Sequence, residues 1–209
     1  MKQVLVVEDH AIVRAGIRRL LDERGDTEVL EAATGEAALA AIASREFALV
    51  ILDLNLPGLA GLELLRRIAR QAPGVPVLVF SQHTEAIYAT RALETGARGF
   101  VSKHASPEEL LEAVEIILNG GVAIEKDVAA EMAAHELSED AYLRPLTERD
   151  LEILRLLSAG DSLSEIADKL GIAYKTVANT LSRIKEKLGV GQTSELIRIA
   201  VSRGLADRV

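Results

Sequence analysis

The segment from Ala48 to Gly58 constrains the fold of this chain more than any other. It begins with five apolar residues, Ala48 to Leu52, a run rich in branched side chains that suits a strand buried on both faces of a parallel sheet. The run ends at Asp53, and Pro57 and Gly58 then turn the chain. The segment therefore predicts an acid at the carboxyl end of a central strand, where open α/β sheets bind ligands. On this segment alone, a loop-capping role for Asp53 is an equally good interpretation.

Strand-like and helix-like segments alternate along the first 121 residues. Strands are predicted over 2–7, 28–32, 47–52, 76–80 and 99–101, and helices over 10–23, 34–44, 59–70, 84–95 and 106–118. Five strands that alternate with five helices predict an α/β fold, a five-stranded doubly wound parallel sheet with right-handed crossovers.

Polar side chains follow four of these five strands. Glu8 and Asp9 follow the first, Asp53 the third, Ser81 the fourth and Lys103 the fifth. Because the carboxyl ends of parallel strands lie along one edge of a sheet, three acids would share one cleft and repel one another. A hard divalent cation such as Mg²⁺ relieves that repulsion, and a lysine ammonium suits a phosphoryl group. The sequence therefore predicts a Mg²⁺ site at which a phosphoryl group moves onto a carboxylate.

Residues 1–121 resemble the receiver domain of two-component response regulators. The resemblance is carried by Glu8-Asp9, Asp53 with Pro57-Gly58, Ser81, and the run Gly96-Ala97-Arg98-Gly99-Phe100-Val101-Ser102-Lys103. It implies a flavodoxin-like strand order 2-1-3-4-5 and a phosphoryl group accepted by Asp53 from a histidine kinase. It also implies that Asp9 and Asp53 bind Mg²⁺, that Glu8 supports it through water, and that Asn55 offers its backbone carbonyl. Glu8 stands where such proteins often have Asp, and it keeps the charge, so we expect metal binding to survive.

The same resemblance implies roles at the fourth and fifth strands. Lys103 would contact the phosphoryl group, and Ser81 and Phe100 would be the pair of residues that switch on phosphorylation. Phe100 replaces a frequent Tyr and so keeps the ring without the hydroxyl. For Phe100, an ordinary place in the core is an equally good interpretation.

Charge divides the chain into two parts. Residues 1–142 hold 13 Lys and Arg against 23 Asp and Glu, whereas residues 143–209 hold 11 against 9. The acidic part would be repelled by nucleic acid, and the weakly basic part need not be. We therefore predict a receiver domain over 1–121, an acidic, Ala-rich solvated linker over 122–143, and a second domain over 144–209. A helix over 127–135 is the alternative for part of the linker.

Four helices are predicted in the second domain. Thr147 is a good N-cap for the first, and a short helix over 162–170, a turn at Gly171 and a longer helix over 174–188 form a helix-turn-helix. The longer helix has a buried stripe that begins at Val177 and ends at Leu188. Its polar residues are predicted to contact double-stranded DNA, with base edges near its start and phosphates further along: Lys175, Thr176, Asn179, Thr180, Arg183 and Lys187.

Residues 146–209 resemble the LuxR-type DNA-binding domain, and the whole chain resembles a NarL/FixJ-type response regulator. The matching segments are Leu146-Thr147-Glu148-Arg149, Glu165-Ile166-Ala167, Leu170-Gly171-Ile172, Lys175-Thr176-Val177 and Lys187-Leu188-Gly189-Val190. The usual pattern has Lys and His where this chain has Ala178 and Thr180, so cationic DNA contacts are lost. The resemblance implies a transcription regulator that forms a homodimer on activation, with RNA polymerase as a further candidate partner.

Three functions from different classes follow from these patterns. A phosphorylation-controlled transcription factor is favoured, and a phosphorelay or interaction protein whose second domain does not bind DNA is the alternative. A metal-dependent phosphatase is weaker, because no second catalytic acid is evident, and we do not expect an enzyme. The chain has no Cys, which excludes disulfides and thiolate metal sites. No apolar run is long enough to span a bilayer, so we expect a cytoplasmic protein without a membrane partner.

Overall fold

The computed structural model divides the chain into two compact units, Met1–Ala134 and His135–Val209. It describes residues 1–57, 61–82, 86–136, 143, 146–202 and 205. Among the helices it describes, none is long and apolar enough to cross a membrane. The predicted turn at Gly58 lies outside the described residues.

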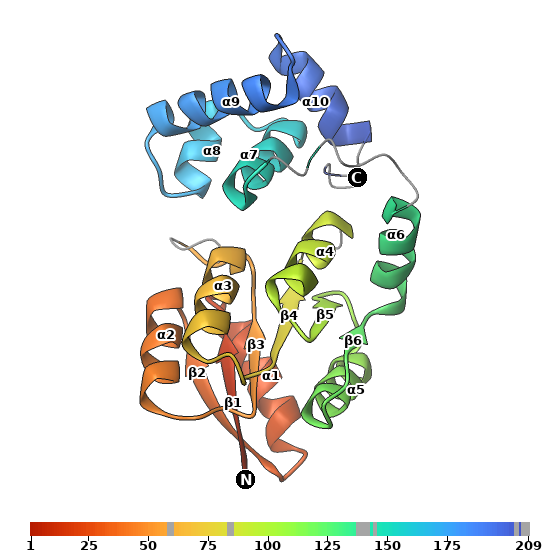
Figure 1. Ribbon diagram of the computed structural model, residues 1–209. Coiled ribbons are helices and arrows are strands. Elements are labelled where there is room, and N and C mark those ends of the chain that lie inside the picture. The colour runs from red at the N-terminus through yellow and green to blue at the C-terminus, as the bar shows by residue number, and fades with distance from the viewer. Residues whose placement is uncertain (58–60, 83–85, 137–142, 144–145, 203–204, 206–209) are drawn as a thin grey trace. The chain divides into compact units, whose positions relative to one another are not determined.

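The first unit is a parallel sheet flanked by helices (Figure 1). Its strand order is β2-β1-β3-β4-β5-β6, so the first five strands follow the predicted flavodoxin-like order. Its elements are β1 (Lys2–Val7), α1 (Ala11–Asp22), β2 (Thr27–Ala32), α2 (Gly35–Ser44), β3 (Leu49–Leu52), α3 (Gly61–Gln71), β4 (Val77–Ser81), α4 (Ala86–Thr95), β5 (Gly99–Ser102), α5 (Pro107–Leu118), β6 (Ala123–Ile124) and α6 (Lys126–Glu136).

The sheet has six strands, so the prediction of five is wrong. The sixth comes from the segment predicted as a solvated linker, in which β6 pairs with β5 and α6 follows. Ala123 and Val128 are buried. The side chain of Glu125 accepts hydrogen bonds from the backbone N–H of Ser102 at 2.6 Å and from its hydroxyl at 3.2 Å. A strand of two residues is too short for any periodicity, which is why the sequence did not reveal it.

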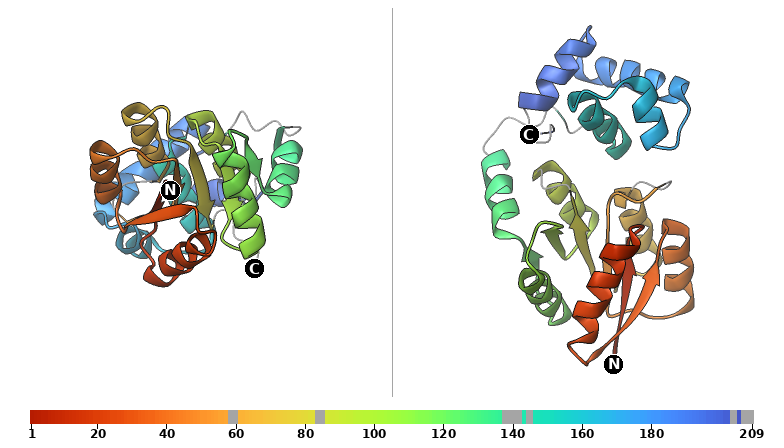
Figure 2. Two further views of the ribbon diagram at one scale, coloured as in Figure 1. Left: turned by 90° about the horizontal axis from the view of Figure 1, so that it is seen from below. Right: turned by 180° about the vertical axis from the view of Figure 1, so that it is seen from behind.

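Helices cover both faces of this sheet (Figure 2). Alternate strand residues such as Val4 and Ile51 pack with residues of α1 and α5, among them Leu21 and Val114. On the other face α3 lies between α2 and α4. The central strands β1, β3 and β4 are therefore buried on both sides, as expected for apolar runs without alternation.

Among the described residues from 143 onward, the second unit contains the four predicted helices: α7 (Glu148–Ser158), α8 (Leu163–Lys169), α9 (Tyr174–Leu188) and α10 (Thr193–Ser202). Thr147 and Ser162 begin α7 and α8 with capping boxes, in which the side chain and the backbone of each cap bond to the third helical residue. The turn between α8 and α9 contains Gly171 with φ of 61°. Val177 and Ile184 on the predicted apolar stripe of α9 are fully buried, which confirms that face.

Candidate functional site

The carboxyl ends of β1, β3 and β5 bring two acids and one lysine into contact. The ammonium of Lys103 lies 2.6 Å from Glu8 Oε2 and 2.8 Å from Asp53 Oδ2. Glu8 and Asp53 are each 1% exposed, and the side chain of Lys103 is 9% exposed. The charges therefore face one another in a place that water reaches poorly, where electrostatic interactions are strong.

Strand register explains this convergence. Val7 of β1 pairs with Leu52 of β3, so the residues that follow them, Glu8 and Asp53, leave the sheet side by side. The backbone N–H of Asp53 still donates to Val7 O at 2.9 Å. On the far side of β4, the backbone N–H of Lys103 donates to Ser81 O at 2.8 Å, which fixes the base of the lysine side chain.

Burial and hydrogen bonding set the direction of the pKa shifts in this site. Burial raises the pKa of Asp53 above its ordinary value, despite hydrogen bonds from Lys103 and from the backbone N–H of Asn55. Burial alone would lower the pKa of Lys103, but its hydrogen bonds to Asp53 and Glu8 raise it instead. The lysine is therefore held as a cation between carboxylates that would be stabilised by further positive charge.

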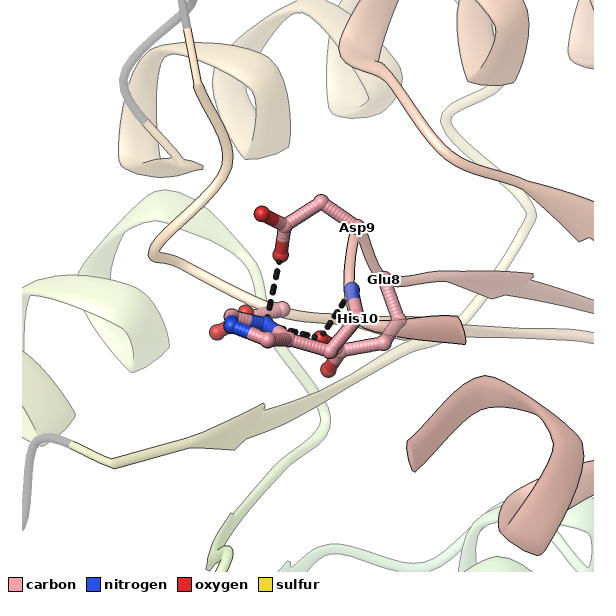
Figure 3. Close-up of side chains that lie close together, drawn as sticks. Glu8, Asp9 and His10 are labelled. Carbon is pink, nitrogen blue, oxygen red and sulfur yellow. Dashed lines mark hydrogen bonds and ion pairs between the residues drawn. The ribbon is translucent and has the colours of Figure 1, made fainter. Parts of the chain in front are cut away.

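The donor set fits a divalent cation. Glu8, Asp9, His10 and Asp53 each offer one ligand atom, and these atoms lie within 4.8 Å of one another. Glu8 Oε2 and Asp9 Oδ1 are both buried. Glu8 Oε2 lies 2.6 Å from Lys103 Nζ. Asp9 Oδ1 lies 2.9 Å from His10 Nδ1 (Figure 3). Carboxylate oxygens gathered this closely are what a hard cation binds.

His10 is the member of this cluster that the sequence reasoning missed. Its ring nitrogen Nδ1 lies 3.0 Å from Glu8 Oε1 and 2.9 Å from Asp9 Oδ1. The sequence pattern that could have indicated it is a histidine directly after two adjacent acids, Glu8-Asp9-His10. From the sequence, His10 is predicted only as the start of the helix over 10–23.

Ser81 and Phe100, the residues expected to switch, are both fully buried at neighbouring strands. Phe100 pairs in register with Val79, and Ser81 with Ser102. Asn55 is half-buried, and its backbone N–H donates to Asp53 Oδ1 at 3.0 Å. The roles assigned to Ser81, Phe100 and Asn55 stay predictions.

The first turns of α9 present a polar surface. Lys175, Thr176 and Asn179 are exposed, as a helix that reads DNA requires. Thr180 is only 7% exposed, so the expectation that it faces outward is wrong. It follows Val177 by three residues and precedes Ile184 by four, and this spacing places it on the buried stripe.

Two cations further along α9 are engaged within the protein. Asp150, which is fully buried near the start of α7, binds Arg183 Nη2 at 2.7 Å and Lys187 Nζ at 2.6 Å. Burial alone would raise the pKa of Asp150, but hydrogen bonds from Lys187, Thr147 and Arg183 outweigh it, so its pKa lies below the ordinary value. Arg183 and Lys187 were expected to contact phosphates, but in the structure they form ion pairs that link α9 to α7.

Comparison with known proteins gives matches over both units. Residues 4–115 match the family described as "Response regulator receiver domain", and residues 144–200 match "Bacterial regulatory proteins, luxR family". The transcriptional activator protein ExaE of Pseudomonas putida is 39% identical over 207 residues, 97% of this chain and 97% of that protein. Response regulator UvrY of Escherichia coli (strain K12) is 34% identical over 211 residues, 99% of this chain and 97% of that protein.

A solved structure is similar along nearly the whole chain. It is RcsB from Salmonella enterica serovar Typhimurium, bound to promoter rprA in the presence of the phosphomimetic BeF3-. Its TM-score is 0.67 at 25% identity, over 94% of this chain and 96% of that one.

Proposed function

The chain belongs to the response regulators that join a receiver domain to a LuxR-family DNA-binding domain, and from this premise we propose that phosphorylation of Asp53 controls its binding to DNA. Residues 1–121 then form the signalling module, residues 144–209 the DNA-binding module, and residues 122–143 the connection. The partner that supplies the phosphoryl group is a histidine kinase, and the regulated partner is double-stranded DNA.

One observation carries the assignment of Asp53: Lys103 Nζ bridges its Oδ2 and Glu8 Oε2 at the carboxyl end of the central strand. In the transfer, a carboxylate oxygen of Asp53 attacks the phosphorus of a phosphohistidine. The new O–P bond forms as the N–P bond breaks, and the histidine leaves with the electron pair. Lys103 then exchanges its contact with the carboxylate for one with the phosphoryl oxygens, where its charge opposes the charge that develops.

Asp9 and Asp53 would hold Mg²⁺, with Glu8 in support and Asn55 offering its backbone carbonyl. When bound, the ion supplies positive charge next to the phosphoryl oxygens and offsets the repulsion between the carboxylates. The buried carboxylate oxygens of Glu8 and Asp9, which lie close to that of Asp53, support this set. Asp53 has its other oxygen fixed by the N–H of Asn55, which orients the attacking carboxylate.

Phosphorylation is read out through the neighbouring strands in this proposal. Ser81 and Phe100 would rearrange when Lys103 moves, because the backbone N–H of Lys103 donates a hydrogen bond to the carbonyl oxygen of Ser81. The rearranged receiver would form a homodimer, which binds two half-sites about one helical turn apart. The similar protein RcsB is bound to a promoter in the presence of a phosphomimetic, which supports DNA binding by the phosphorylated chain. On α9, Lys175, Thr176 and Asn179 would make the first contacts with DNA.

Intact-mass measurement tests the acceptor. Incubation with acetyl phosphate and Mg²⁺ should add one phosphoryl group to the wild-type chain and none to Asp53→Asn. Asp22→Asn, which removes an exposed acid at the end of α1, is the matched control and should label fully. Labelling of Asp53→Asn at another single carboxylate would refute the assignment.

Gel-shift and sedimentation measurements at a stated salt concentration test the output. The phosphorylated chain should sediment as a dimer with DNA and bind a target duplex more tightly than the unmodified chain. The alternative, an interaction protein that does not bind DNA, is favoured by Ala178, by Thr180 and by the low net charge of residues 143–209. The pairing of Arg183 and Lys187 with Asp150 also favours it. This alternative would be favoured over the transcription regulator if the phosphorylated dimer bound no duplex at low salt.

A further inference from the structure

His10 places an imidazole nitrogen among the carboxylates of the proposed metal site (Figure 3). Its Nδ1 lies 2.9 Å from Asp9 Oδ1 and 3.0 Å from Glu8 Oε1. The backbone N–H of His10 also donates to Glu8 Oε1 at 3.0 Å. The ring is 64% exposed, and among the described residues its recorded side-chain contacts are with these two acids.

These distances have the spacing of ligands around one ion. In an octahedral site with metal–ligand bonds of about 2.1 Å, neighbouring ligand atoms lie about 3.0 Å apart. Nδ1 meets each of the two oxygens at that separation. The three atoms are therefore placed closely enough to surround one metal ion.

The surrounding contacts keep His10 and the two acids in this arrangement. Residue 10 is the N-cap of α1, yet its side chain makes no capping hydrogen bond, which leaves the ring to the cluster. Arg14 Nη1 donates to the carbonyl oxygens of Glu8 at 2.7 Å and Asp9 at 3.3 Å, which fixes the backbone that carries all three ligands. Lys103 pairs with Glu8 Oε2, so Glu8 turns its other oxygen, Oε1, toward the ring.

We propose that His10 is an additional metal ligand, and that it makes this site prefer first-row transition-metal dications such as Co²⁺ over Mg²⁺. Imidazole nitrogen is a better ligand for these ions than for Mg²⁺, which takes oxygen ligands and keeps its waters. The inference rests on the metal site of the proposed function, and it does not depend on phosphoryl transfer.

Calorimetric titration with Co²⁺ and with Mg²⁺ tests the inference on three full-length proteins at about pH 8, where free histidine is neutral. They are the wild type, His10→Ala, and His104→Ala, which removes an exposed histidine of the loop after β5 as the matched control. In His10→Ala the affinity for Co²⁺ should fall about 10- to 100-fold, while the affinity for Mg²⁺ stays within about twofold. In His104→Ala both affinities should match the wild type.

A spectroscopic measurement gives a second readout. Pulsed electron paramagnetic resonance of bound Mn²⁺ should detect a coupled ¹⁴N nucleus in the wild type and in His104→Ala, and none in His10→Ala. An unchanged ratio of Co²⁺ to Mg²⁺ affinity in His10→Ala, with Mg²⁺ still bound, would overturn the role of His10 and leave the proposed function standing. Failure of the wild type to bind either ion would overturn the metal site itself, and this inference with it.

Discussion

Lys187→Ala is the substitution for which the sequence and the structure predict different results. The sequence predicts that Lys187 contacts a phosphate, so its loss would weaken DNA binding without affecting the fold. In the structure its ammonium lies 2.6 Å from Asp150 Oδ2, and the Asp150 side chain is fully buried. We therefore expect Lys187→Ala to destabilise the second unit and to leave the salt dependence of DNA binding unchanged.

The size of the stability loss follows from this contact. A hydrogen bond to a charged group contributes about 1.5–3 kcal/mol, and removal of one partner leaves the other charge buried. Lys187 is 25% exposed, and Arg183 still pairs with Asp150, so the lower part of that range applies. The expected loss is about 1.5–2 kcal/mol, which for a unit of this size lowers the unfolding temperature by roughly 6–16 °C.

The expected effect on DNA binding is measured by the salt slope. Each lost phosphate contact reduces the slope of log affinity against log salt by about 0.9. Between about 50 and 200 mM salt, the affinity of the wild type should therefore fall about 3.5-fold further than that of a variant that lacks one phosphate contact. Lys175 is exposed at the start of α9, and no ion pair is recorded for it among the described residues, so Lys175→Ala should show this change without a loss of stability.

Two assays separate the alternatives. Scanning calorimetry of the full-length chain should show a lower second-unit transition in Lys187→Ala and unchanged transitions in Lys175→Ala. Binding of one duplex across several salt concentrations should give a reduced slope for Lys175→Ala alone. A Lys187→Ala protein of wild-type stability, with a slope reduced by about one unit, would refute the reasoning.

Three further predictions concern other residues. The pKa of Asp150 is lower in the folded chain than in the unfolded chain, where it is about 4. The carboxylate therefore stabilises the fold at pH values above about 4. This stabilisation is lost as the pH falls from about 4 toward the pKa of the folded state. Asp150→Asn should therefore be less stable near neutral pH and should show a weaker loss below about pH 4, as measured by denaturant unfolding. Gly61→Ala should cost about 2 kcal/mol or more, because its Cβ would collide with the backbone of Leu54, whereas Gly74→Ala, with open space around it, should not. Asn179→Ala should relax preference at one base position by about 1–3 kcal/mol in competition binding, with wild-type thermal stability.

Local patterns in the sequence determined the first five strands of the sheet and the four helices of the second unit. The apolar run before Asp53 marked a strand buried on two faces, and strands alternating with helices allowed essentially one kind of sheet. Because parallel strands end at a common edge, Glu8, Asp53 and Lys103 could be placed in one site without any coordinates. The helix-turn-helix likewise followed from caps and a Gly-containing turn.

Only the tertiary structure decided the contacts between residues far apart in the chain. Asp150 lies 33 residues before Arg183 and 37 before Lys187, and their pairing depends on how α7 packs against α9. A charged residue on a helix has the same periodicity whether it faces DNA or a buried acid, so no local pattern distinguishes the two. The ring nitrogen of His10 is a similar case, because its distances depend on the loop conformation held by Arg14. Periodicity determines which face of an element is apolar, and packing alone determines which polar groups then meet.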